Sequence, residues 1–133
     1  MASAKKLIQQ YYDAFNKQDM DAFLALLDDN VVHHINQGDE ELGKAAFAKF
    51  MQRMSTSYRE NISALTIMTN EDGTRAAAEF MVDGEYLSND TGLPKANGQA
   101  YRLPCGTFFS IKNNKISRVT TYYNLQNWLE QVR

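Results

Sequence analysis

The start of the chain carries apolar residues at helical spacing. Ser3 precedes this run and is a suitable N-cap, and Asp19 can cap a second, short helix that ends at residues 28–30. Five residues share one face of the first predicted helix: Leu7, Ile8, Tyr11, Tyr12 and Phe15.

The next segment mixes three predicted elements. Residues 31–35 are β-branched at three of five positions, which favours a short strand. Residues 38–43 form a polar, acidic stretch that predicts a loop. Apolar residues then return at helical spacing over 44–54 and predict a third helix.

The second half of the chain reads as strands. Turn residues at 70–73 and 112–114 indicate two hairpins, and the Gly-, Pro- and Asn-rich stretch at 88–98 indicates a loop. A last helical turn or two is predicted at 125–132. Helices followed by a long meander argue for an α+β fold. The four strand-like runs are 62–69, 74–87, 99–111 and 115–123.

Length and charge narrow the class of protein. The chain has 133 residues, which suits one domain over 1–133. The net charge is -2 and the basic residues are scattered, so we expect no nucleic-acid partner. No apolar run approaches a membrane span, and the N-terminus lacks the apolar core of a signal peptide. The lone Cys105 excludes an intrachain disulfide, and we expect a cytoplasmic protein.

The opening segment at 11–21 reads YYDAFNKQDMD. It resembles the first two helices of ketosteroid isomerase and its SnoaL-like relatives in the nuclear-transport-factor-2-like (NTF2-like) superfamily. Three further blocks resemble a group of ketosteroid isomerase-related proteins of unassigned activity: HHINQG at 33–38, GLPKANGQAY at 92–101 and YYNL at 122–125.

The resemblance implies a cone-shaped fold. In this family a strongly bent, mainly antiparallel sheet closes with the helices around a pocket that admits a small apolar ligand. A bent sheet needs bulges or glycines, and Asp83-Gly84 within a long predicted strand is a candidate position.

The resemblance also implies a site. The family tyrosine donor falls on Tyr11, and the position of the catalytic base falls on His34. The position of the protonated aspartic acid falls at or next to Thr107, where the chain has no acid. Because one of three functions is retained, steroid isomerisation by the family mechanism is not expected. His34 suits proton transfer near neutral pH, but a half-buried structural histidine is an equal alternative.

Other polar residues are weaker candidates. Glu79 lies in a mostly apolar strand and could pair with His34 inside the cone, although an exposed outer face is slightly favoured. Asn124 falls where related polyketide cyclases place an aspartic acid. Asn36 and Asn124 can orient a ligand, or they can serve as ordinary turn and strand-end hydrogen-bonding groups.

Four aromatic residues are candidates for the pocket wall, although strand aromatics belong more often to a core. No metal site is expected, because His33 and His34 are adjacent on a strand and point to opposite faces. No cofactor motif occurs. The four aromatic residues are Tyr101, Phe108, Tyr123 and Trp128.

Two functions therefore stay open, ahead of a third, mainly structural role in which the sheet serves dimerisation. One is a cofactor-free enzyme of the isomerase or cyclase type, performing acid–base chemistry on an apolar carbonyl or ring compound with Tyr11, His34 and Glu79 as candidate catalytic residues. The other is a binding protein that holds a small apolar ligand without changing it. The resemblance also implies a homodimer.

Overall fold

The computed structural model describes residues 3–36 and 38–133. Helix α1 (Ala4–Lys17) begins where Ser3 Oγ accepts the amide hydrogen of Lys6, and α2 (Met20–Ala25) begins where Asp19 Oδ1 accepts that of Ala22. Both predicted N-caps are thus confirmed. The third helix, α3 (Lys44–Ser57), follows Gly43, and α4 (Leu125–Val132) closes the chain.

Within the described residues, six strands form one sheet in the order β2-β1-β6-β5-β4-β3. All neighbouring strands are antiparallel except β1 and β6, which run parallel and join the start of the chain to its end. This mixed α+β architecture confirms the predicted fold class. The strands are β1 (Leu27–His34), β2 (Glu40–Leu42), β3 (Tyr58–Thr69), β4 (Arg75–Tyr86), β5 (Gln99–Lys112) and β6 (Lys115–Tyr123).

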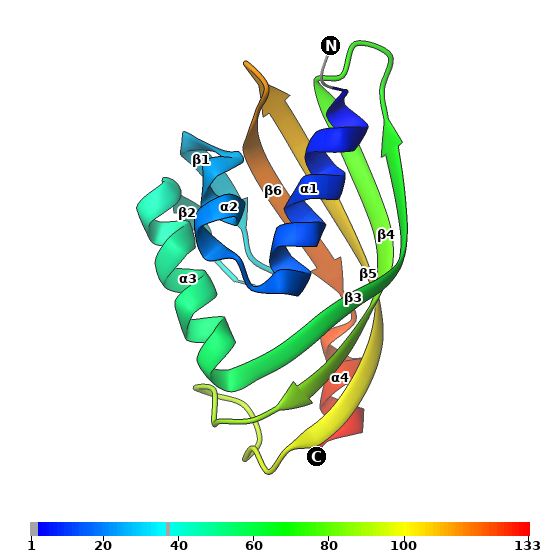
Figure 1. The fold of residues 1–133 in the computed structure, drawn as a ribbon. Coiled ribbons are helices and arrows are strands. Elements are labelled where there is room, and N and C mark those ends of the chain that lie inside the picture. The colour runs from blue at the N-terminus through cyan, green and yellow to red at the C-terminus, as the bar shows by residue number, and fades with distance from the viewer. Residues whose placement is uncertain (1–2, 37) are drawn as a thin grey trace.

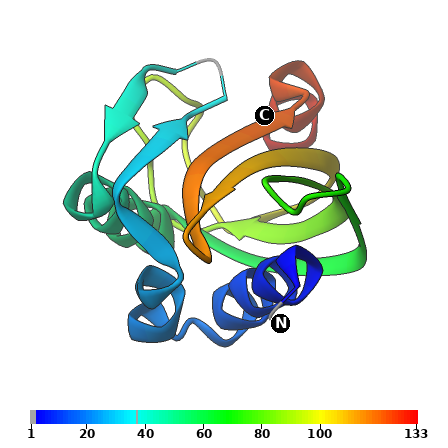
Figure 2. The same ribbon diagram turned by 90° about the horizontal axis from the view of Figure 1, so that it is seen from above.

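The sheet is strongly curved, and the first three helices lie on its inner side (Figure 1). Seen from above, the strands curl around the core while α1, α2 and α3 close the open side (Figure 2). Helix α4 packs against β5 at the far end of the sheet. The result is a half-cone of strands closed by helices (Figures 1 and 2).

The ladder between β3 and β4 contains one irregularity. The β3–β4 register shifts between Ser63 and Thr66, and Ala64 adopts a left-handed φ of 53°. The irregularity is therefore a bulge in β3. The register runs unbroken through Asp83 and Gly84 in β4, so this position, expected to supply a bulge or a glycine for the bend, supplies a glycine and no bulge.

Two other boundaries differ from the sequence-based expectation. Residues 40–42 form β2, which pairs with β1, although the polar pattern predicted only a loop. Strand β3 begins at Tyr58 rather than at residue 62, because its first residues pair with the end of β4. Both hairpins are confirmed, and Asn113 and Asn114 adopt the positive φ values that a two-residue turn needs.

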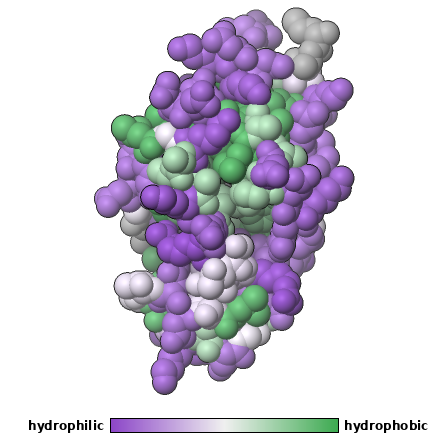
Figure 3. Space-filling view, turned by 60° about the vertical axis from the view of Figure 1, so that its left-hand side comes forward, coloured by the Kyte–Doolittle hydropathy of each residue, from purple (hydrophilic) through white to green (hydrophobic). Residues whose placement is uncertain are grey.

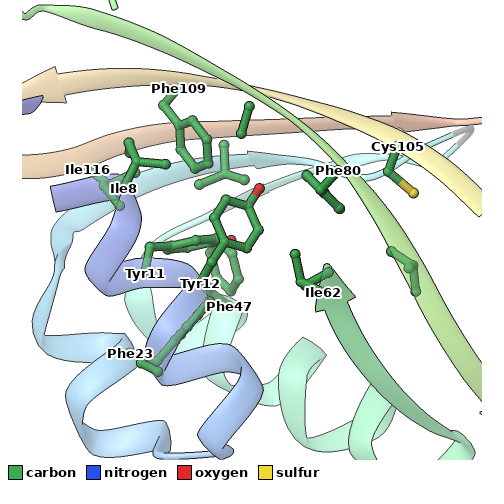
Figure 4. Close-up of a cluster of buried hydrophobic side chains, with 14 of the residues drawn as sticks. Ile8, Tyr11, Tyr12, Phe23, Phe47, Ile62, Phe80, Cys105, Phe109 and Ile116 are labelled. Carbon is green, nitrogen blue, oxygen red and sulfur yellow. The ribbon is translucent and has the colours of Figure 1, made fainter. Parts of the chain in front are cut away.

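Aromatic side chains of α1 meet the sheet in the core (Figure 4). The Tyr11 ring lies 5.3 Å from that of Phe109, and the Tyr12 ring 5.0 Å from that of Phe80. These contacts fix α1 over the inner face of β4 and β5. No helix in the described part of the chain is long and apolar enough to cross a membrane.

Candidate functional site

A cavity of about 710 Å³ lies between the helices and the inner face of the sheet. Its size and mostly apolar lining are those of small-molecule sites. Hydrophobic side chains form a patch within a mostly hydrophilic surface on the flank where α3 lies (Figure 3).

Glu60 is held by a row of residues across three strands. It pairs with Gly84 of β4, which in turn pairs with Tyr101 of β5. The Tyr101 side chain lies over Gly84, where a Cβ would come within 2.5 Å of the tyrosine hydroxyl oxygen. That hydroxyl donates a hydrogen bond of 2.5 Å to Glu60 Oε2. The missing side chain at Gly84 therefore allows a tyrosine two strands away to orient the carboxyl group.

Burial makes Glu60 a weaker acid than a free side chain. Its pKa is raised, because desolvation in the cavity wall outweighs the opposing effect of the Tyr101 hydrogen bond. The same desolvation raises the pKa of Tyr101 far above that of a free tyrosine, and the charge of Glu60 adds to this effect. The pair thus behaves as one carboxyl group with a raised pKa and a neutral phenol beside it.

A second acid–tyrosine pair lies near the first. Tyr58 Oη donates a 2.8 Å hydrogen bond to Asp90 Oδ2, and the Tyr58 ring stacks on Tyr86 at 5.3 Å between centroids. Tyr86 is fully buried, and its hydroxyl accepts the Asp90 amide hydrogen and donates to the carbonyl of Pro94. Tyr86 therefore fixes the 88–98 loop so that Asp90 faces the cavity.

Tyr11 and Tyr12 reach the cavity from α1, and their side chains lie side by side in Figure 4. Burial raises the pKa of both phenols far above 10, although a hydrogen bond with Thr107 partly offsets the effect for Tyr12. Both hydroxyls are therefore neutral donors at any physiological pH.

The two histidines of β1 face opposite sides of the sheet. The His33 ring lines the cavity, is only 5% exposed and stacks on Phe47 at 4.1 Å between centroids. Desolvation, together with the neighbouring His34, lowers the pKa of His33 to about 4, so its imidazole is neutral at pH 7. His34 lies on the outer face, where its ring nitrogens contact Thr120 at 2.8 Å and Glu40 at 2.7 Å.

A family model for the SnoaL-like domain matches residues 8–119. The chain belongs to the SnoaL-like family. A protein from Pseudomonas putida KT2440, provisionally named a polyketide cyclase, is 56% identical; the match covers 98% of each chain with a TM-score of 0.98. A Xanthomonas campestris protein with the same provisional name is 52% identical, with 98% and 96% covered and a TM-score of 0.95.

A more distant structure shows the fold alone. An NTF2-like protein of unknown function from Burkholderia pseudomallei is 14% identical, yet it covers 99% of this chain and 98% of its own with a TM-score of 0.82. The predicted membership in the SnoaL-like family is confirmed by the family model and the close relatives, and the NTF2-like fold is confirmed by the distant structure. No curated protein matches the chain.

The SnoaL-like cavity gathers only part of the predicted site. Tyr11, Asn36, Tyr123 and Trp128 line it, and Tyr101 stands behind Glu60. Asn36 Oδ1 accepts a 3.4 Å hydrogen bond from the Tyr123 amide, while its Nδ2 is buried and has no partner among the described residues.

Four predicted residues lie outside this SnoaL-like cavity. His33 lines the cavity in place of the predicted His34, because neighbouring residues of β1 face opposite sides of the sheet and His34 faces outward. Glu79 and Phe108 lie on the exposed outer face of the sheet, where the Phe108 ring contacts that of Tyr122. Asn124 is the N-cap of α4, and its side chain accepts the Asn127 amide hydrogen at 3.1 Å.

The cavity residues that sequence-based reasoning missed include the three titratable groups His33, Glu60 and Asp90. A usable signal existed for Glu60, since Tyr58, Glu60 and Ile62 alternate along one face once β3 is known to start at residue 58. No group of three or more potential metal-binding side chains occurs in the described part of this SnoaL-like chain.

Proposed function

We propose that the protein is a small-molecule enzyme of the isomerase or cyclase type that transfers protons on an apolar carbonyl or ring compound held in the cavity. One observation carries the proposal. Glu60 sits in an apolar cavity, has a raised pKa and is oriented by Tyr101. A carboxyl group tuned toward neutral pH is suited to both accepting and returning a proton.

The chemistry follows from the charge states of the groups. The Glu60 carboxylate takes a proton from the carbon next to a ligand carbonyl, and the electron pair of that C–H bond moves to the carbonyl oxygen as an enolate. Neutral phenols such as Tyr11 and Tyr12 can donate hydrogen bonds to that oxygen. The Glu60 carboxylic acid then returns the proton, to the same carbon or to a conjugated one.

The names of the close relatives support an enzyme of the cyclase type. Proteins 56% and 52% identical to this chain are provisionally named polyketide cyclases. The proposal assigns proton transfer to Glu60, in place of the earlier candidates His34 and Glu79, which lie outside the cavity.

A hydrogen–deuterium exchange assay tests the proposal directly. The probe is 2-tetralone, a small apolar ring ketone, dissolved in D₂O with the protein, and NMR follows deuterium entering next to the carbonyl. Wild type should accelerate exchange, and Glu60→Gln should lower the enzyme-dependent rate by roughly 100-fold or more.

The outer-face acid gives a matched control. Glu79→Gln removes the same charge from β4 without touching the cavity, and it should exchange at the wild-type rate. A Glu60→Gln variant as active as Glu79→Gln would overturn the proposal. If 2-tetralone binds but wild type does not exchange it, the alternative of a non-catalytic binding protein is favoured instead.

A further inference from the structure

Two histidine–glutamate pairs face each other across β1 and β2. The antiparallel register pairs His33 with Glu41 and His34 with Glu40. Because side chains alternate along a strand, the first pair lies on the inner side of the sheet and the second on the outer side. The chain contains only these two histidines.

The outer pair is fully hydrogen-bonded. His34 Nε2 lies 2.7 Å from Glu40 Oε2, and its Nδ1 lies 2.8 Å from Thr120 Oγ1. Since a carboxylate can only accept, the neutral His34 ring carries its proton on Nε2 and accepts the Thr120 hydroxyl proton at Nδ1.

The inner pair is not. His33 Nδ1 lies 3.9 Å from Glu41 Oε1, and both atoms are buried without a hydrogen-bond partner in the described part of the chain. Buried polar atoms without partners are rare and point to a function or to stored strain. The ring has little freedom to turn away, because Phe47 stacks on it at 4.1 Å and Phe50 meets its edge at 4.6 Å.

Electrostatics select one form of the His33 ring. With its proton on Nδ1, the N–H group points toward the negative Glu41 oxygen. With its proton on Nε2, a nitrogen lone pair would face that oxygen instead, which is repulsive in a buried setting. The favoured form leaves the lone pair of Nε2 on the side of the ring away from Glu41. The cavity lies against this ring.

We propose that Glu41 is a positioning residue that holds His33 as the Nδ1–H tautomer, so that Nε2 serves the cavity as a second proton-transfer atom. This inference rests on the proposed function. Glu41 itself does not line the cavity and acts only through His33.

In the proposed step, one proton moves from the ligand to His33 Nε2 and later returns to the ligand. Nε2 takes a proton from an O–H or C–H group of the ligand, and the ring becomes an imidazolium with a proton on each nitrogen. The positive charge strengthens the attraction between Nδ1–H and Glu41, so the 3.9 Å separation shortens to a charge-assisted hydrogen bond. When Nε2 returns its proton to the ligand, the pair relaxes. Catalytic hydrogen bonds are often long before the ligand is bound.

Nitrogen-15 NMR of the two histidine rings tests the tautomer without turnover. At pH 7 wild type should show opposite tautomers, with Nδ1–H on His33 and Nε2–H on His34. A His34→Gln variant assigns the signals. Glu41→Gln should remove the preference of His33 and leave His34 unchanged, whereas Glu40→Gln should do the reverse. An Nε2–H form of His33 in wild type, or a His33 spectrum that ignores Glu41→Gln, would overturn the inference.

Two further measurements, ligand binding by NMR and the rate of 2-tetralone exchange, test the role of His33 Nε2. Addition of 2-naphthol, whose hydroxyl can donate to Nε2, should shift the Nε2 signal of His33 and not that of His34. The 2-tetralone exchange rate should fall roughly 10-fold in Glu41→Gln at unchanged KM, and Glu41→Asp should restore part of it. Glu40→Gln should match wild type. The inference is contradicted if the chemical shift of His33 Nε2 does not change on addition of 2-naphthol, or if Glu41→Gln and Glu40→Gln have equal 2-tetralone exchange rates.

These outcomes separate the two proposals. An active Glu60→Gln variant removes the proposed function, yet the tautomer of His33 still decides whether Glu41 orients the ring. Conversely, Glu60→Gln can lose exchange while the His33 tautomer is unchanged in Glu41→Gln. That result supports the proposed function and contradicts the positioning role of Glu41.

Discussion

Gly84→Ala should cost more stability than its single methyl group suggests. Glycine is usually the weaker residue in a strand, so replacement by alanine is expected to stabilise by roughly 0.5–1 kcal/mol where space allows. At position 84 the new Cβ would come within 2.5 Å of the Tyr101 hydroxyl oxygen and 2.6 Å of its Cε2. Both distances are far inside van der Waals contact, and Tyr101 is only 4% exposed, so the ring has little room to yield.

The magnitude follows from two contributions. Overpacking a filled site costs about 1–3 kcal/mol. Displacement of the ring also breaks the hydrogen bond from Tyr101 to Glu60, and a hydrogen bond to an ionisable partner contributes about 1.5–3 kcal/mol. Gly84→Ala should therefore lower the free energy of unfolding by roughly 3 kcal/mol. It should also slow 2-tetralone exchange, because Glu60 loses the group that orients it.

Urea unfolding with a matched control checks the prediction. Gly106→Ala adds the same methyl group to β5, where the nearest atom is the Ala78 carbonyl oxygen at 3.9 Å, and it should be close to neutral. In a Tyr101→Ala background, Gly84→Ala should become nearly harmless, giving a coupling free energy of about 2 kcal/mol or more in the double-mutant cycle. Equal stabilities for Gly84→Ala and Gly106→Ala, or additive effects with Tyr101→Ala, would refute the reasoning.

Three further predictions concern pH, charge and assembly. The pKa of His33 is lowered from 6.5 to about 4, so the unfolded chain binds more protons than the folded chain between those pH values. The free energy of unfolding should therefore fall by up to about 3 kcal/mol from pH 6.5 to pH 4. In urea titrations, His33→Phe should flatten this pH dependence. Glu60 has the opposite sign: its raised pKa means that the folded state loses stability as pH rises above the unfolded value near 4.5, so Glu60→Gln should unfold at higher urea than wild type at pH 8 and lose that advantage near pH 4. The homodimer implied by the family resemblance stays a prediction, with the exposed outer-face side chains Phe108 and Tyr122 as its candidate contacts; native mass spectrometry should show a dimer in wild type and a monomer in Phe108→Asp.

Local signals predicted the elements of this fold well. Ser3 and Asp19 begin their helices as N-caps, and Asn113 and Asn114 form the two-residue turn. Each of these features depends on side chains and backbone within a few positions of one another, so the sequence contains the whole cause. The β2 strand was missed because its three residues are polar or exposed and gain their structure only by pairing with β1.

The candidate site depends on contacts that no local pattern contains. Tyr101 reaches Glu60 across 41 positions of sequence, and it does so because Gly84 on the strand between them lacks a side chain. The sequence marked this glycine as a candidate position for a bulge or a bend, but not as the place where a side chain crosses the strand, since all of these require a small residue. Only the register of three neighbouring strands distinguishes the two causes.

The sequence analysis placed His34 in the cavity, whereas the structure places His33 there, and this error also has a non-local cause. A strand places alternate residues on opposite faces, and a shift of one residue reverses the assignment. Apolar residues normally reveal the inner face, but Val31 and Val32 are both apolar, so the pattern leading into the two histidines does not set the phase. In the structure Val31 is fully buried together with His33, whereas Val32 pairs with Leu42 on the same side as His34. The parallel ladder with β6 fixes this phase, and with it which histidine–glutamate pair meets the ligand.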